Sequence, residues 1–138
     1  MMEQFNSPSI LGIGIDTVET SRIDRAVKRW GNRFLKRVFS ESEIAYCNKK
    51  NSEASHLAAR FAAKEACLKS LGLGLDGGIA LNKIIIANNQ SGKPELTIDK
   101  DLSAILKKSD SFVFHLSMTH TKEYASAIVI LEARVDRL

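Results

Sequence analysis

Two carboxylates lie in segments of the sequence whose other residues predict burial. Asp16 follows two glycines in the stretch GIGID, and Glu65 lies in the alanine-rich stretch RFAAKEACLKS. A pair of carboxylates with few other protein ligands suits Mg²⁺, which keeps several waters and completes its octahedron with phosphate oxygens of a substrate. These two residues therefore indicate a Mg²⁺-assisted site that acts on a phosphorylated ligand.

Positive groups and backbone donors for such a ligand occur at three other places. Lys64 and Lys69 are close to Glu65 in the sequence, and a glycine-rich turn with Gly72 and Gly74 follows them. Backbone N–H groups of glycine-rich turns and lysine ammonium groups both bind phosphate oxygens. His120, at the end of an alternating segment in the run SMTHTK, would add another donor.

Each feature also has a plainer interpretation. Glu65 and Lys69 could form an i,i+4 ion pair without a function, since such pairs are common and weak at helix surfaces. A single histidine at a strand end, such as His120, is more often only solvated. GIGID is not a P-loop, because no GK[ST] follows it. His56 and His115 have no cysteine or carboxylate at metal-ligand spacing, so zinc is not expected.

The densest positive charge in the chain lies in residues 22–37. Its cations, which alternate with apolar residues, are Arg22, Arg25, Lys28, Arg29, Arg33, Lys36 and Arg37. This pattern fits either the solvated face of an amphipathic helix or a docking surface for an acidic partner.

The order of the predicted elements is mixed. Apolar residues alternate with glycines and Asp16 over residues 10–19, which predicts a strand whose glycines let a backbone or ligand approach. Ser21 should cap a helix over 22–30, which Gly31 ends. Ser40 and Glu43 form an S-x-x-E capping box for a helix over 41–50. The helix through Glu65 should be largely buried, because most of its circumference is alanine. Further along, the patterns predict an apolar run at 79–81, a turn at 88–94, a helix over 99–108 and strands over 83–87, 95–98, 111–120 and 124–133.

The composition limits the classes of protein. The 138 residues fit one domain, which we expect over residues 10–138 after a loose tail at 1–9. A net charge of +4 is too small to indicate nucleic acid, but it suits an acidic protein or a phosphorylated ligand. The sequence lacks a signal peptide and an apolar run that could span a membrane, and Cys47 and Cys67 lack metal or CxxC spacing. We therefore expect reduced thiols and a cytoplasmic location.

Three segments of the chain resemble the holo-[acyl-carrier-protein] synthase family, the small single-domain 4′-phosphopantetheinyl transferases. They are GIGIDTVETSRID, FAAKEACLKSLGLGL and LSMTHTKEYASAIVILE, in the family's order and spacing, and the turn QSGKPEL also fits. The resemblance covers residues 11–132. It implies an α+β fold in which a mainly antiparallel sheet packs against a long buried helix. It also implies a homotrimer with active sites between subunits, which would explain strands that are apolar on both faces.

The resemblance further implies a reaction and a set of residues. The family transfers the 4′-phosphopantetheine arm of coenzyme A to a serine of apo acyl carrier protein, for fatty acid biosynthesis, and releases adenosine 3′,5′-bisphosphate. Carried onto this chain, the Mg²⁺ ligands are Asp16 and Glu65, which act in catalysis with Lys69. The implied coenzyme A contacts are Lys64, Lys69, Gly72, Gly74 and His120, and the implied carrier-protein contacts are Arg22, Arg33 and Arg37.

One residue departs from the family pattern. Leu73 stands where the family usually has a hydroxyl residue, so a side-chain hydrogen bond to phosphate is not available there. We expect in-line attack by the carrier serine on the β-phosphate, with a metal-bound water or Glu65 as the base. The alternative class is a non-catalytic basic module that binds an acidic protein or RNA, and such a module would not depend on Asp16 or Glu65.

Overall fold

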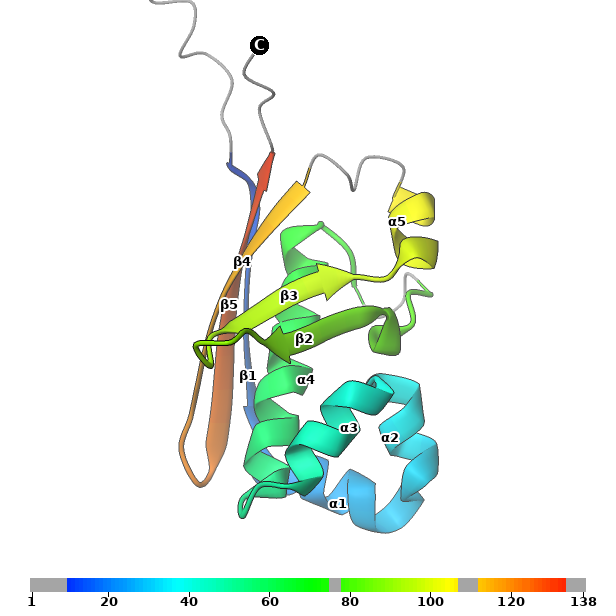
Figure 1. The fold of residues 1–138 in the computed structure, drawn as a ribbon, viewed down its shortest axis with the longest axis vertical. Helices are drawn as coiled ribbons and strands as arrows, with labels where there is room; N and C mark the ends of the chain where they lie inside the picture. The colour runs from blue at the N-terminus through cyan, green and yellow to red at the C-terminus, as the bar shows by residue number, and fades with distance from the viewer. Residues whose placement is uncertain (1–9, 75–77, 107–111, 134–138) are drawn as a thin grey trace, which may run out of the picture.

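Helix α4, Glu53–Ser70, is the element around which the chain folds (Figure 1). The computed structural model describes residues 10–74, 78–106 and 112–133. The other elements are β1 Ile10–Glu19, α1 Thr20–Trp30, α2 Asn32–Val38, α3 Glu41–Asn48, the 3₁₀ helix η3 Leu81–Lys83, β2 Ile84–Asn88, β3 Pro94–Ile98, α5 Lys100–Leu106, β4 Phe112–His120 and β5 Tyr124–Ala133. The loose tail predicted for residues 1–9 lies outside the described residues.

Two antiparallel sheets flank α4. The larger sheet has the order β1-β5-β4, and the smaller sheet pairs β2 with β3. One face of the larger sheet packs on α4, while β2, α1 and α3 pack on other sides of that helix (Figure 1). Strand β3 lies between β2 and β4, and α2 lies further from α4 (Figure 1). This arrangement confirms the predicted α+β fold with a long buried helix, although the antiparallel strands form two sheets. The strands predicted at 10–19 and 124–133 are confirmed at both ends.

Glycines allow β1 and α4 to meet backbone against backbone. A methyl group added to Gly12 would lie 1.9 Å from the carbonyl oxygen of Ser70, and one added to Gly14 would lie 1.8 Å from that of Ala66. No side chain larger than hydrogen fits at either position. The two glycines predicted to mark a close approach therefore mark that of the α4 backbone.

Helix α4 is buried along almost its whole length, as its alanine content predicts. Ala58, Ala59, Ala62, Ala63 and Ala66 are each at most 2% exposed. The helix ends in a Schellman motif, in which Gly72 has φ +73°, its N–H donates to Lys69 O, and Leu73 N–H donates to Leu68 O. Leu73 is half-buried and packs against the hydrophobic core.

The helices before α4 agree with most of the sequence signals. Gly31, with φ +55°, ends α1, and the capping box of Ser40 and Glu43 begins α3. The predicted cap at Ser21 is wrong, because α1 starts at Thr20 and Ser21 lies within it. The apolar run at 79–81 leads into the 3₁₀ helix η3. The end of the helix predicted over 99–108 falls outside the described residues.

The outer face of the larger sheet carries exposed apolar side chains. On β1, Leu11, Ile13 and Ile15 are 51%, 60% and 63% exposed, and Ile128 on β5 is 38% exposed. An antiparallel sheet usually presents a polar face to water when its other face packs on a core. None of the helices within the described ranges is long and apolar enough to cross a membrane.

Candidate active site

Asp16, Glu65 and Lys69 meet where β1 crosses α4. The Nζ of Lys69 donates to Asp16 Oδ1 at 3.2 Å and to the carbonyl oxygen of Ile15 at 2.9 Å. Glu65 lies one turn earlier on the same helix, beside Asp16. The contact of Gly14 with the α4 backbone sets this spacing, because Asp16 is two residues further along the same face of the strand. The structure thus brings together the three residues predicted to act in catalysis.

The two carboxyl groups of this site repel each other. The pKa of Glu65 is raised above its usual value, first because the group is partly buried and second because the Asp16 carboxylate lies beside it. The charges of Arg22 and Lys69 oppose that rise. The Oδ2 atom of Asp16 is buried and has no hydrogen-bond partner among the described residues. A cation placed between the carboxylates would satisfy that oxygen and remove the repulsion.

The donors at this position fit a hard divalent cation. No group of three or more His, Cys, Asp or Glu side chains suited to a metal ion occurs within the part of the chain that the structure describes. The protein therefore offers two carboxylates, those of Asp16 and Glu65. Mg²⁺ commonly binds through one or two carboxylates and leaves its other positions to water and substrate phosphates.

The prediction that Lys64 contacts coenzyme A is wrong. Its side chain is 0% exposed, and its Nζ donates to Glu43 Oε1 at 2.7 Å, Leu81 O at 3.0 Å and Ile84 O at 2.6 Å. An ammonium group has three N–H donors, so all are used inside the protein. Successive helical residues differ by about 100° in direction, which turns Lys64 away from Glu65 towards α3 and β2.

The glycine turn after α4 lies within reach of Lys69. Gly72 and Gly74 are both exposed, as an approaching ligand requires. Leu73, between them, packs inwards as the apolar residue of the Schellman motif. Its position explains why a hydroxyl is not needed there for the turn to form.

His120 belongs to a second group of positive and aromatic side chains, around the other side of α4. Its ring centroid lies 5.1 Å from that of His56. The guanidinium of Arg60, 4.4 Å from the ring centroid of Tyr46, donates to His56 O and Asn88 Oδ1. Its Nε has no partner among the described residues. The pKa of His56 is lowered by burial and by the neighbouring His120 and Arg60, so the surroundings are positive.

The sequence predicted His120 as a coenzyme A contact but did not group it with His56 and Arg60. Arg60 is a charged residue on a helix that the sequence predicts to be buried. A buried charge requires a partner or a ligand. His56 precedes Arg60 by four residues on the same helix. Its proximity to His120 depends on how α4 crosses β4, which no local pattern reveals.

The two groups face different directions around α4. At about 100° per residue, Arg60 lies about 140° and His56 about 180° from Glu65 around the helix axis. Lys69 lies only about 40° from Glu65, on the β1 side. Within one chain, the helix itself therefore separates the carboxylate pair from the histidine group.

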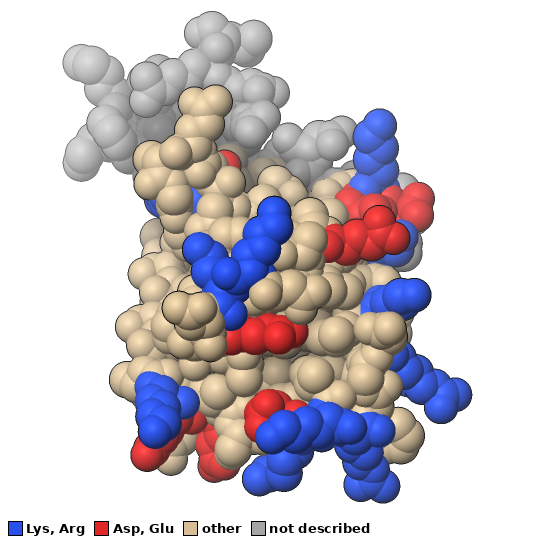
Figure 2. Space-filling model, turned by 60° about the horizontal axis from the view of Figure 1, so that its bottom comes forward, with Lys and Arg blue, Asp and Glu red and all other residues tan. Residues whose placement is uncertain are grey.

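Positive charge gathers over the short helices, which form the face turned forward in Figure 2. Arg33 and Arg37 line a hollow of about 320 Å³ together with Trp30 and Phe34. Arg22 lies apart from that hollow, with its guanidinium 5.9 Å from the ring centroid of Phe61 on α4. The three arginines predicted to bind a carrier protein thus divide into two positions.

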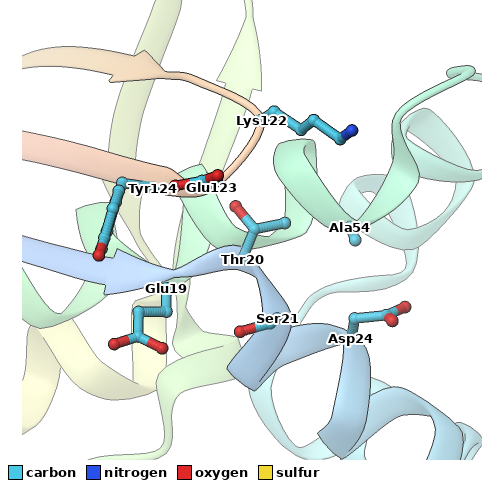
Figure 3. Close-up of a pocket in the computed structure, with 8 residues that line it drawn as sticks. All are labelled: Glu19, Thr20, Ser21, Asp24, Ala54, Lys122, Glu123 and Tyr124. Atoms are coloured by element: carbon cyan, nitrogen blue, oxygen red, sulfur yellow. The ribbon is translucent and has the colours of Figure 1, made fainter.

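A further hollow, of about 470 Å³, lies between the start of α1 and the turn from β4 to β5 (Figure 3). Its lining residues are Glu19, Thr20, Ser21, Asp24, Ala54, Lys122, Glu123 and Tyr124. Three carboxylates stand there against one lysine, so the hollow does not suit an anionic ligand.

Comparison with known proteins decides the family. Residues 12–129 match the family model of the 4′-phosphopantetheinyl transferase superfamily. The holo-[acyl-carrier-protein] synthase of Syntrophus aciditrophicus (strain SB) is 44% identical over 125 residues, which cover 91% of this chain and 98% of that protein. The chain belongs to the holo-[acyl-carrier-protein] synthase family.

Solved structures of holo-[acyl-carrier-protein] synthases agree with the fold. The Neisseria meningitidis enzyme superposes with a TM-score of 0.80 at 34% identity, covering 89% of this chain and 98% of that chain. The Helicobacter pylori enzyme, solved in complex with coenzyme A, gives a TM-score of 0.75 at 33% identity and covers 87% of this chain and 99% of that chain.

Proposed function

We propose that this protein transfers the 4′-phosphopantetheine arm of coenzyme A to a serine of apo acyl carrier protein and releases adenosine 3′,5′-bisphosphate. The observation that carries the proposal is the Asp16–Glu65 pair with Lys69 beside it, in a chain of this family. We propose, with this reaction, a cytoplasmic location and a role in fatty acid biosynthesis.

Asp16 and Glu65 would hold Mg²⁺. The buried Oδ2 atom of Asp16 and the raised pKa of Glu65 both support a cation between them. When bound, the ion would neutralise negative charge on the pyrophosphate of coenzyme A. Lys69 would release Asp16 Oδ1 and turn its ammonium group to the same phosphates, since its side chain is 54% exposed.

The reaction requires mainly positioning and charge stabilisation. The carrier serine attacks the β-phosphate in line and its proton passes to a base, for which Glu65 is the candidate among the protein groups. The bond between the β-phosphorus and the adenosine 5′-phosphate oxygen breaks, and that oxygen leaves as part of adenosine 3′,5′-bisphosphate. Lys69 and the backbone N–H of Gly74 would stabilise the negative charge that develops on the phosphates, because the N–H groups of Gly72 and Leu73 are used within the turn. Arg22, whose charge acts on Glu65, would lie where the carrier serine enters.

The second positive group would bind another anionic part of coenzyme A, such as its 3′-phosphate. Arg60 provides its positive charge, and His120 and His56 lie beside it, on the other side of α4 from Glu65. We infer that a coenzyme A molecule that touches both groups contacts two chains, because the buried helix α4 lies between them. This division supports active sites between subunits.

The outer face of the larger sheet would form the subunit interface of a homotrimer. Leu11, Ile13, Ile15 and Ile128 leave an apolar surface on the strand that carries Asp16. Contiguous apolar patches of this kind usually mark interaction sites in water-soluble proteins. A second and a third copy of this chain would cover the patch and bring a foreign histidine group towards each carboxylate pair.

Acyl carrier proteins as a class are acidic, and the face formed by α1 and α2 would receive them. Arg33 and Arg37 provide charge, and Trp30 and Phe34 give their hollow an apolar floor. Arg22, on α1, is close enough to Glu65 for its charge to lower the pKa of that carboxyl group.

Intact-mass measurement tests the proposal directly. Purified protein is incubated with an apo acyl carrier protein of bacterial fatty acid synthesis, coenzyme A and either Mg²⁺ or EDTA. We expect the carrier to gain the mass of one phosphopantetheine group with Mg²⁺ and to remain unmodified with EDTA. A carrier that stays apo under both conditions, with a known synthase active in parallel, would overturn the proposed function.

A further inference from the structure

Lys64 and Glu43 form a fully buried ion pair that the proposed reaction does not use. The ammonium nitrogen of Lys64 lies 2.7 Å from Glu43 Oε1, and both side chains are 0% exposed. Glu43 Oε1 also accepts the N–H of Ser40, and its Oε2 accepts the N–H of Ile86 at 3.2 Å. Every donor of the ammonium group and both oxygens of the carboxylate therefore have partners.

Stability alone does not account for such a pair. Removing two charges from water costs about as much as their attraction returns, and apolar replacements are often equally stable. A buried ion pair is better explained by the elements whose relative position it fixes. This pair joins the start of α3, the middle of α4, η3 and β2.

The pair fixes the return of the chain after the glycine turn. That turn leaves α4 at Gly72, and among the residues described after it, Leu81 and Ile84 accept hydrogen bonds from Lys64 of α4 through their carbonyl oxygens. The same return segment is tied to α2, because Asn82 Nδ2 donates to Lys36 O at 3.1 Å. Lys64 is also the residue before Glu65 on the helix. One side chain thus links the carboxylate end of the site to the far end of the turn.

We propose that Lys64 and Glu43 are positioning residues for the transfer reaction, because they hold the return of the glycine turn at a fixed place against α4. The backbone N–H of Gly74 then meets the coenzyme A phosphates in a set geometry relative to Glu65. Neither residue touches substrate. This inference rests on the proposed function, and it explains why a cation next to the carboxylate site points away from it.

The test compares a charge-free pair with a matched core variant. Lys64→Met with Glu43→Gln removes both charges and keeps similar side-chain volumes. Leu102→Ala is the control, because Leu102 is 2% exposed in α5, outside the network. For each protein we would measure the melting temperature, the Michaelis constants for coenzyme A and carrier, and coenzyme A binding by calorimetry, well below the melting temperature.

We expect the double variant to raise the Michaelis constant for coenzyme A about tenfold or more, as small misplacements of binding groups do. The constant for carrier protein should change much less. Leu102→Ala should lower the melting temperature while leaving both constants near those of the wild type. An unchanged coenzyme A constant in the folded double variant, or an equal rise in the control, would overturn the inference.

A second variant covers the case in which the double variant does not fold. Glu43→Asp keeps the charge balance and withdraws the carboxylate by one methylene, so it should show a smaller rise of the coenzyme A constant with the same selectivity. If Glu43→Asp folds and shows no such rise, the inference is wrong. If the wild type transfers no phosphopantetheine, the proposed function has failed. Calorimetry then tests the positioning role by itself, through the affinity of the wild type and of the variants for coenzyme A. A wild type that neither transfers nor binds would overturn both.

Discussion

Gly14 on β1 and Ala66 on α4 are in backbone contact, and a methyl group on Gly14 would lie 1.8 Å from the Ala66 carbonyl oxygen. Glu65 precedes Ala66, and Asp16 is the next residue after Gly14 on the same face of β1. The distance between the two carboxylates is therefore set by a contact that side chains cannot adjust.

Gly14→Ala should destabilise the protein severely. The new methyl group cannot fit without moving β1 from α4, and overpacking of this kind costs about 1–3 kcal/mol or more. Denaturant unfolding measures the loss. Gly92→Ala is the control, because open space surrounds Gly92. Only the φ of +86° at Gly92 disfavours a side chain, and this strain lowers stability by about 1–2 kcal/mol. Equal losses in the two variants would contradict the close contact.

Asp16→Asn and Glu65→Gln should each reduce turnover by about 100-fold or more, since each removes charge on which the site depends. Both replacements keep the size of the side chain, so circular dichroism should show an intact fold. Wild-type turnover in either purified variant would mean that the pair does not hold a catalytic cation.

The stability of the metal-free protein should depend on Glu65 in a defined direction. The pKa of Glu65 is raised in the folded state. At pH values between its ordinary pKa and its raised pKa, the unfolded chain therefore binds fewer protons than the folded protein. Stability contributed by the protonated group is therefore lost as pH rises through this window. His56, with a lowered pKa, acts in the opposite direction at pH values just below its ordinary pKa.

Melting temperatures measured in EDTA over a pH series, for wild type and Glu65→Gln, isolate the glutamate. The difference between the curves removes the part due to His56. We expect Glu65→Gln to be relatively more stable at neutral pH than at acid pH, and Mg²⁺ to raise the melting temperature of the wild type only. Parallel curves would show that burial and Asp16 do not raise the pKa of Glu65.

Charge reversal at the basic face should affect the carrier protein more than coenzyme A. Arg33→Glu and Arg37→Glu should raise the Michaelis constant for carrier, and the wild-type constant should rise with salt because exposed charges are screened. Arg22→Glu is less selective, because Arg22 also acts on Glu65. Lys100→Glu on α5 is the control with the same charge change. Carrier kinetics that stay the same in both face variants at low salt would place the dock elsewhere.

Ile13→Lys should dissociate the oligomer. Ile13 is 60% exposed in the single chain, so the lysine leaves the fold intact but opposes a covered apolar interface. Light scattering after gel filtration should show a trimer for the wild type and a smaller species for the variant, with transfer activity lost in parallel. Ala87→Lys, on an exposed position of β2, should change neither. A monomeric wild type with full activity would exclude the interface.

Local patterns predicted the elements better than the contacts between them. The limits of β1 and β5, the capping box of Ser40 and Glu43 and the burial of α4 all follow from residues close together in the sequence. Asp16 and Glu65 were found because a carboxylate is unusual in segments that otherwise predict burial.

Contacts between distant segments were harder to predict. Lys64 and Lys69 both lie near Glu65 in the sequence. Helical geometry predicts that their side chains point in different directions, but it does not predict which of the two side chains meets a ligand. That choice depends on β1, which packs on the Lys69 side, and on Glu43, which draws Lys64 inwards. The pairing of His56 with His120 was missed for the same reason, since these two residues are brought together only by the packing of α4 against β4.

The separation of the carboxylate pair from the histidine group by α4 has a genetic consequence. If each coenzyme A draws on two chains, as we propose, Asp16→Asn damages one half of a site and His120→Ala damages the other half. Two such defective chains, co-expressed, can assemble some sites in which both halves are wild type. A cell carrying both alleles would then regain activity that neither allele provides alone.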